Sequence, residues 1–360
     1  MQSSNLPARK RLDWIDRTKG LAILGIVLFH FFQNYPDRLF IVSFLDKFGA
    51  KFGLVAVDLF FVIAGFNISY SIKDKLLYNL AFWKSWLIKR LDRLYPTYIF
   101  AVCCSLLLYA VSGRSVRYFS LEFVMSFLGL GGYLLQAINP GFWFFTVILQ
   151  AYLLTPVLYI WLKGNRRSFL IFGIVAGVLT KTICLQLEPG SSAYRYFLNN
   201  NFLGSYIFQF GLGLYWGCIY VSHGALRKSD YMTSLVLFCS GAIAYIGFAV
   251  QNIDIVYMQG FDIVFTPFLF ILCILGFQFF ENLKPIFPFL KVLSILGIYS
   301  YPIYLIHQPM LFVTLPKLVN FFTLNSTPKV MVCLLFTALL LLFYIIVFVK
   351  LENWLTKKLA

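Results

Sequence analysis

Charged residues are scarce in this sequence. Of its 360 residues only 12% are charged and 60% are hydrophobic, whereas about a quarter of the residues in a soluble domain are charged. This shortage excludes a chain that is mostly surrounded by water. Apolar runs of about 20 residues recur along the sequence, and each can cross roughly 30 Å of hydrocarbon as a helix. The sequence therefore predicts an all-α, polytopic integral membrane helical bundle.

Potential metal ligands are also few. The chain has three histidines and seven cysteines. The cysteines lie in apolar stretches without the spacing of metal ligands, so we expect small buried side chains rather than a zinc site or a disulfide framework. We predict no metal and no permanently bound cofactor.

The net charge of +16 does not indicate a nucleic-acid partner. Lys and Arg concentrate in the short segments between apolar runs, where they fix topology and contact anionic membrane lipids.

The apolar runs predict ten transmembrane helices within a single membrane-embedded domain, 1–360. We place them at about 20–34, 52–72, 94–112, 141–162, 168–187, 202–222, 232–250, 260–280, 293–313 and 330–349. The segment 119–137 is also apolar, but Glu122 and three glycines at 129, 131 and 132 weaken a helix there. We expect it to be re-entrant or to lie at the outer interface.

Charge decides the predicted orientation. With ten spans and the N-terminus inside, the cytoplasmic segments carry 21 Lys and Arg residues against eight outside, as the positive-inside rule requires. Residues 1–19 and 350–360 are then cytoplasmic. The stretch 74–93 alternates apolar and basic residues, which is typical of an amphipathic helix on the cytoplasmic surface.

Two of the three histidines fall inside predicted spans, where ionisable groups are costly and mark functional sites by default. His30 follows Lys19 by about three turns, which places it about 16 Å deeper on nearly the same face, in line with Asp16. In the ninth span, Tyr304 and His307 share a face, with His307 about 21 Å from the cytoplasmic end of a straight helix. His307 has either a packing role or a functional one.

Four other charges need an explanation. Arg90 and Arg93 lie one turn apart on the cytoplasmic side, where they serve either as topology anchors or as forks for phosphate oxygens. Asp58 and Lys181 lie inside predicted spans, and we expect them to form an ion pair that offsets the cost of burying both charges.

Five segments occur in the order typical of one known family. They are Leu12–Gly20 together with His30, Val57–Phe66, Arg90–Pro96, Phe142–Phe144 and Tyr301–Pro309. Jointly they resemble the acyltransferase-3 family of membrane O-acyltransferases, although Ala64 stands where that family usually has serine.

The resemblance implies a ten-helix bundle that takes an acyl group, often acetyl from acetyl-CoA, and places it on sugars of a surface glycan. It also implies a bacterial inner membrane, His30 as the catalytic residue, and Lys19, Arg90 and Arg93 near the donor. Further candidates for acceptor binding or catalytic support are Asp16, Asp58, Trp143, Tyr304 and His307.

We therefore predict an acyl-CoA donor, a glycan or lipid-linked glycan acceptor, and His30 as either general base or acyl carrier. A hydroxyl is a poor nucleophile until a base accepts its proton, and a buried neutral histidine can do so. The alternative is a transporter or flippase for a lipid-linked glycan or small solute, although the sequence shows no clear inverted repeat.

Overall fold

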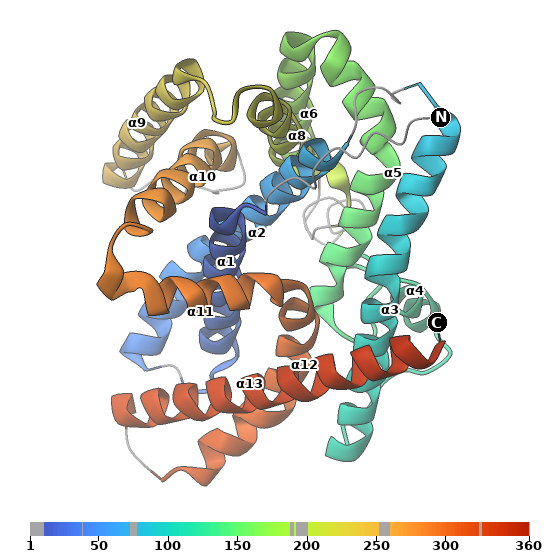
Figure 1. Cartoon of the computed structure of the whole chain (residues 1–360). Coiled ribbons are helices and arrows are strands. Elements are labelled where there is room, and N and C mark those ends of the chain that lie inside the picture. Colours follow the sequence, from blue (N-terminus) through green and yellow to red (C-terminus); the bar gives the residue numbers. More distant parts are fainter. Residues whose placement is uncertain are drawn as a thin grey trace.

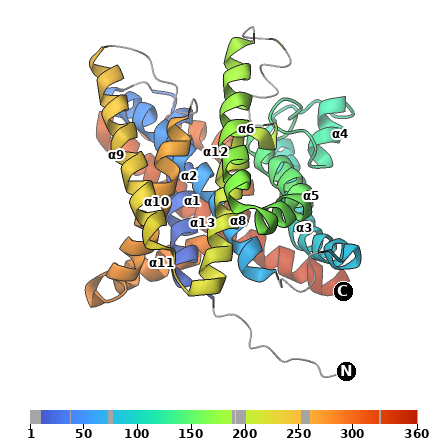
Figure 2. The ribbon, with the colours of Figure 1, turned by 90° about the horizontal axis from the view of Figure 1, so that it is seen from above.

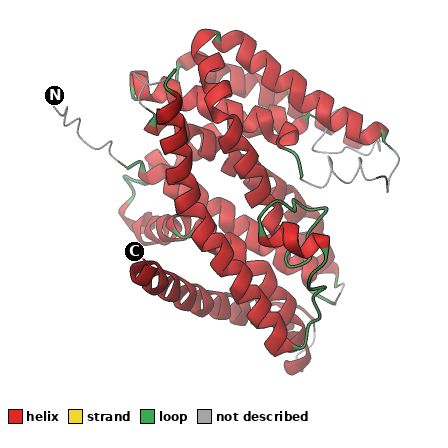
Figure 3. Cartoon of the chain, turned by 90° about the vertical axis from the view of Figure 1, so that its right-hand side faces the viewer, coloured by secondary structure: helices red, strands yellow, loops and turns green. Residues whose placement is uncertain are grey.

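The structure is a computed structural model that describes residues 11–37, 39–72, 78–187, 191, 201–251, 260–323 and 326–359. Two predicted features, the first ten residues and the start of the amphipathic stretch at 74–77, lie outside these residues. Every regular element in the described part is a helix (Figure 3). The predicted all-α class is therefore confirmed.

Each of the ten predicted spans coincides with a helix or a pair of helices. They are α1 (Asp13–Asn34), α2 (Phe40–Ser71), α3 (Leu80–Ser112), α5 (Trp143–Gly164), α6 (Arg166–Gln186), α8 (Ile207–His223), α9 (Lys228–Val250), α10 (Phe261–Phe280), α11 (Phe287–Ile298) with α12 (Ser300–Phe321), and α13 (Ser326–Leu359). Short 3-10 turns occur at Pro140–Phe142, Leu203–Tyr206 and Lys284–Ile286.

Within the described residues, six helices are long and apolar enough to cross a membrane, or seven if α11 and α12 form one span. The chain is an integral membrane protein built as a polytopic helical bundle, and the number ten stays a prediction.

Helix α1 lies in the middle of the bundle and packs against α2, α11 and α12. Helices α9 and α10 lie to one side of it, and α3 and α5 to the other (Figures 1 and 2). Only 11% of the apolar stretch of α9 and 22% of that of α13 is buried inside the protein. We expect these two helices to face lipid, which is as apolar as their side chains.

Glycines allow the central helices to touch backbone to backbone. A Cβ added to Gly213 of α8 would lie 2.0 Å from the carbonyl oxygen of Val62 on α2. A Cβ on Gly297 of α11 would lie 1.7 Å from the carbonyl oxygen of Asp16 on α1. Small residues at such crossings are what lets membrane helices approach closely.

Gly213→Ala is expected to destabilise the folded protein, whereas Gly247→Ala is not. The added methyl group clashes with the backbone of Val62 at the first position, while nothing lies within 4 Å of it at the second. Because overpacking costs about 1–3 kcal/mol or more, thermal unfolding in detergent should begin several degrees lower for Gly213→Ala. Equal unfolding temperatures for the two variants would contradict the close crossing of α2 and α8.

The predicted ninth span, 293–313, is not one straight helix. It breaks at Tyr299, and the helices on either side meet at 78°. Pro302 lies in the first turn of α12, and because proline has no N–H it cannot continue the hydrogen bonds of a preceding helix. The depth of about 21 Å that a straight helix gave His307 was therefore wrong.

Helix α3 runs without a break across the predicted boundary between an interfacial helix at 74–93 and a third span. The position of its first part at the membrane surface stays a prediction. Helix α3 begins after its N-cap Asn79 and continues through Pro96 to its end. Trp83 and Trp86 hold its first part, because both are buried in an aromatic cluster with α5. A proline in the helix interior removes one backbone hydrogen bond, and this packing offsets the loss.

The segment 119–137 contains the seven-residue helix α4 (Leu121–Phe127) followed by turns, so it has no helix of spanning length. Hydrogen bonds tie it to the helices beside it. Tyr95 of α3 donates its hydroxyl to the carbonyl of Leu128 over 2.9 Å, and Thr146 of α5 accepts from the N–H of Gly132 over 2.9 Å.

The expected ion pair between Asp58 and Lys181 was wrong. Lys181 pairs with Asp262, and both side chains are almost completely buried. Asp58 accepts a hydrogen bond of 3.1 Å from the hydroxyl of Thr266. Asp262, in the first turn of α10, is the carboxylate that the fold brings to the ammonium group.

We expect the connection between α5 and α6 to face the cytoplasm, because Lys163, Arg166 and Arg167 flank it. Gly164 is exposed and a Cβ there meets nothing within 4 Å. In intact cells Gly164→Cys should resist a membrane-impermeant thiol reagent, whereas Ser115→Cys, on the predicted outer side, should react. Labelling of the first variant before permeabilisation would reverse the predicted topology.

Candidate functional site

A cavity of about 650 Å³ lies between α1, α2, α3, α5 and the junction of α11 with α12. Each long helix lines it with one face, because side chains three and four positions apart point the same way. The residues at this spacing are Phe60, Ile63, Ala64, Asn67, Tyr70 and Ser71 of α2, Arg90, Arg93, Leu94 and Thr97 of α3, and Phe144, Ile148 and Tyr152 of α5.

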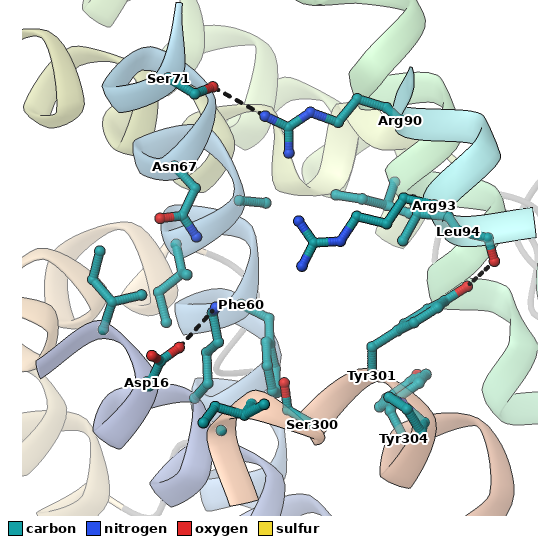
Figure 4. Close-up of a pocket in the computed structure, with 18 of the residues that line it drawn as sticks. Asp16, Phe60, Asn67, Ser71, Arg90, Arg93, Leu94, Ser300, Tyr301 and Tyr304 are labelled. Atoms are coloured by element: carbon teal, nitrogen blue, oxygen red, sulfur yellow. Dashed lines mark hydrogen bonds and ion pairs between the residues drawn. The ribbon is translucent and has the colours of Figure 1, made fainter. Parts of the chain in front are cut away.

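The break between α11 and α12 forms another wall of the cavity. Gly297 before the break and Ser300, Tyr301 and Tyr304 after it all line the cavity. The hydroxyl of Tyr301 donates to the carbonyl of Leu94 over 3.1 Å, which joins α12 to α3 (Figure 4). The break thus places the last residues of α11 and the first residues of α12 at the same site.

Two arginines of α3 point into the cavity (Figure 4). Arg90 donates to the hydroxyl of Ser71 over 3.0 Å, and its guanidinium lies 5.5 Å from the ring of Trp86. Arg93 forms no hydrogen bond or ion pair with the residues that the structure describes, and its side chain is exposed. One guanidinium is held in place and its neighbour is available to a ligand.

Asp16 of α1 forms ion pairs with two more basic side chains at the cavity. Its carboxylate lies 2.5 Å from Nε of Arg11 and 3.4 Å from Nζ of Lys19. The hydrogen bond to Asp16 raises the pKa of Arg11, so this guanidinium stays charged. With four basic side chains and one carboxylate among its lining residues, the cavity carries net positive charge. It is suited to an anion with several phosphate oxygens.

The two histidines of the predicted spans lie in contact with each other. Nε2 of His307 is 3.0 Å from Nδ1 of His30. His307 is completely buried, whereas His30 is half-buried. The ring of Tyr304, which lines the cavity, lies 5.8 Å from the ring of His307. Tyr304 therefore connects the cavity wall with the histidine pair.

The structure brings most of the predicted site residues together. Asp16, Lys19, Arg90, Arg93 and Tyr304 line one cavity, and His30 with His307 lies behind Tyr304.

Two predicted candidates lie elsewhere. Trp143 packs behind the cavity wall, with its ring 6.0 Å from that of Phe144 and stacked 5.6 Å from that of Tyr206. Asp58 is buried beside α10, where Thr266 donates to it. Neither residue lines the cavity.

Several lining residues were not predicted. Arg11 precedes α1, and Asn67 and Ser71 occupy the last two turns of α2. A signal for the latter two was present in the sequence, since two polar side chains four residues apart at the end of an apolar run share one face. Tyr152 of α5 offered no such signal. Within the described residues no group of three or more His, Cys, Asp or Glu is placed to hold a metal ion.

The helical fold and the cavity define an integral membrane protein with a positively charged internal site. Sequence comparison defines its family. Residues 12–350 match the family model described as an acyltransferase domain. The chain therefore belongs to this acyltransferase family, as the five segments predicted.

A curated relative is the peptidoglycan O-acetyltransferase OatA of Listeria monocytogenes, which is 24% identical over 348 residues. The match covers 88% of this chain and 52% of the relative, so the chain spans about half the length of that protein. No solved structure matches the chain.

Proposed function

We propose that the protein transfers an acyl group, in the first place acetyl, from acyl-CoA to a hydroxyl of a glycan or glycolipid. One observation carries the proposal: Tyr304 lines a cavity with four basic side chains, its ring lies 5.8 Å from that of His307, and His307 is in contact with His30. The cavity can thus bind an anionic donor, and the histidines beside it can accept a proton. The acyltransferase family and the O-acetyltransferase relative support the reaction class.

The donor fits the distribution of charge in the cavity. Coenzyme A carries its negative charge on phosphates and its thioester at the end of an uncharged arm. Arg93, with Arg90 and Lys19, would bind the phosphates, because guanidinium forks match phosphate oxygens and form charge-assisted hydrogen bonds. Phe60 and Phe144 supply apolar lining for the arm.

His30 is the residue to which we assign the chemistry. In one route its ring accepts the proton of the acceptor hydroxyl while the oxygen attacks the thioester carbonyl. The carbon–sulfur bond breaks, the thiolate leaves, and it takes up the proton from His30. In the other route a ring nitrogen of His30 attacks the thioester carbonyl first, the carbon–sulfur bond breaks, and CoA leaves as a thiol with the proton of the ring. The acceptor hydroxyl then attacks the acyl-histidine, the carbon–nitrogen bond breaks, and the hydroxyl proton returns to His30.

The test uses purified full-length protein in liposomes without any ion gradient. Acetyl-CoA labelled in the acetyl group is supplied with a soluble peptidoglycan oligosaccharide, and products are examined for an acetyl ester that mild base releases. An enzyme should form this ester and release CoA. A transporter or flippase would do neither, so the absence of both products would contradict the proposal.

Mass spectrometry of surface glycans from cells with and without the protein extends this test to the natural acceptor. Loss of an acetyl ester in the absence of the protein is the expected result.

A further inference from the structure

The hydrogen bonds of His307 define which of its nitrogens carries a proton. Its Nδ1 lies 3.1 Å from the carbonyl oxygen of Ile303 and 2.7 Å from that of Tyr304. Carbonyl oxygens can only accept, so Nδ1 of His307 must be the donor. In the neutral ring Nε2 is then left with a lone pair and can only accept.

The same argument applies to His30. Its Nδ1 lies 3.0 Å from the carbonyl oxygen of Ile26 and 3.0 Å from Nε2 of His307. Both neighbours are acceptors, so Nδ1 of His30 must carry the proton and share it between them. Nε2 of the neutral His30 ring is then an unprotonated nitrogen with a free lone pair.

We propose that His307 is a positioning residue, which together with the carbonyl of Ile26 holds the ring of His30 with its proton on Nδ1 and makes Nε2 the reacting atom. This inference rests on the proposed function of His30. Neutral imidazole can carry its proton on either nitrogen, and the hydrogen bond made by one nitrogen decides the state of the other. His307 is itself fixed, because it is fully buried and held by two carbonyls of its own helix.

The hydrogen bonds of this histidine pair resemble those of a catalytic triad. There, a buried side chain bonded to Nδ1–H of a histidine keeps the ring in the tautomer whose Nε2 works as a base. In this protein the buried partner is a second histidine, whose Nε2 takes the place of the acceptor oxygen. Tyr304 contributes twice, since its carbonyl orients His307 and its side chain lines the cavity.

The first test observes the protons directly and needs no activity. The chain has three histidines, so nitrogen-15 NMR of histidine-labelled full-length protein gives few signals, and His30→Ala, His307→Leu and His223→Ala assign them. Both His30 and His307 should show a protonated Nδ1 and an unprotonated Nε2. A wild-type His30 with its proton on Nε2 would overturn the inference.

The second test replaces the acceptor atom. The amide oxygen of His307→Gln lies about where Nε2 lies and can accept from His30, whereas His307→Leu has a similar size and no acceptor. We expect the leucine variant to lose roughly tenfold or more in kcat with an unchanged donor KM, and the glutamine variant to recover most of it.

Three outcomes separate this inference from the function on which it rests. Wild-type protein that forms no acetyl ester would overturn the proposed function, while the NMR result still decides the tautomer. Ester formation at equal kcat in wild type, His307→Gln and His307→Leu would overturn the positioning role alone. Equal loss in both variants, with native unfolding temperatures, would also overturn it, because an acceptor would then not suffice.

Discussion

His30→Ala is expected to abolish acyl transfer while the protein still folds and binds its donor. General base catalysis contributes about 10²–10⁴-fold to rate. If His30 instead carries the acyl group, no transfer can occur without it. Donor binding should remain, because the basic side chains that line the cavity are all at other positions and His30 does not line it. Product formation from labelled acetyl-CoA measures kcat, and equilibrium dialysis with a non-hydrolysable CoA thioether measures donor affinity.

The matched control is His223→Ala. His223 lies exposed in the last turn of α8, far along the chain from either histidine of the pair. The two variants remove the same side chain, so a general effect of histidine loss would appear in both. A His30→Ala protein with near wild-type kcat would remove this residue from the mechanism, and a drop of similar size in His223→Ala would show that the assay reports folding.

Replacing Arg90 and Arg93 together by glutamine is expected to weaken donor binding roughly a hundredfold. A hydrogen bond to a charged group contributes about 1.5 kcal/mol or more, and two such losses add to about 3 kcal/mol. Arg93 has no partner among the described residues, so its replacement removes no ion pair there. The difference from wild type should shrink as salt rises, because screening already weakens binding to the intact cavity.

Two controls make this result specific. Lys89→Gln removes a charge from the same helix at an exposed position that does not line the cavity, and donor affinity should be unchanged. Replacing both arginines by lysine keeps the charge and loses the planar fork, so an intermediate affinity is expected. If the folded glutamine variant binds the donor as tightly as wild type, these arginines only anchor the topology.

The apolar runs predicted where helices occur, but not how they continue or stop. Run length and charge are local properties, and they sufficed for ten helical stretches. The continuity of α3 through Pro96 depends on Trp83 and Trp86 packing against another helix, which no local pattern reports. The break at Tyr299 had a local signal in Pro302, but that signal could not show that α11 packs against α1.

For the site, the distribution of Lys and Arg placed Lys19, Arg90 and Arg93 near one membrane surface, and the family resemblance placed them near the donor. The structure gathers them around one cavity. Spacing within one helix could not show that His30 and His307 touch, because their contact depends on how α1 and α12 pack. The partner of Lys181 was missed for the same reason, since Asp58 and Asp262 were both available in the sequence and only packing selects between them.

The glycine crossing of α1 and α11 affects how mutational scans of this protein will look. Gly20 and Gly297 have no side chain that could bind or react, yet a Cβ on either would lie within 2 Å of the opposite backbone. Any substitution there would push α11 outward and shift the start of α12, which carries Tyr304 and His307. A misplacement of about 1 Å can cost a hundredfold in rate. A scan that scores acylated product would therefore rank both glycines beside His30, and its map of intolerant positions would extend well beyond the reacting groups.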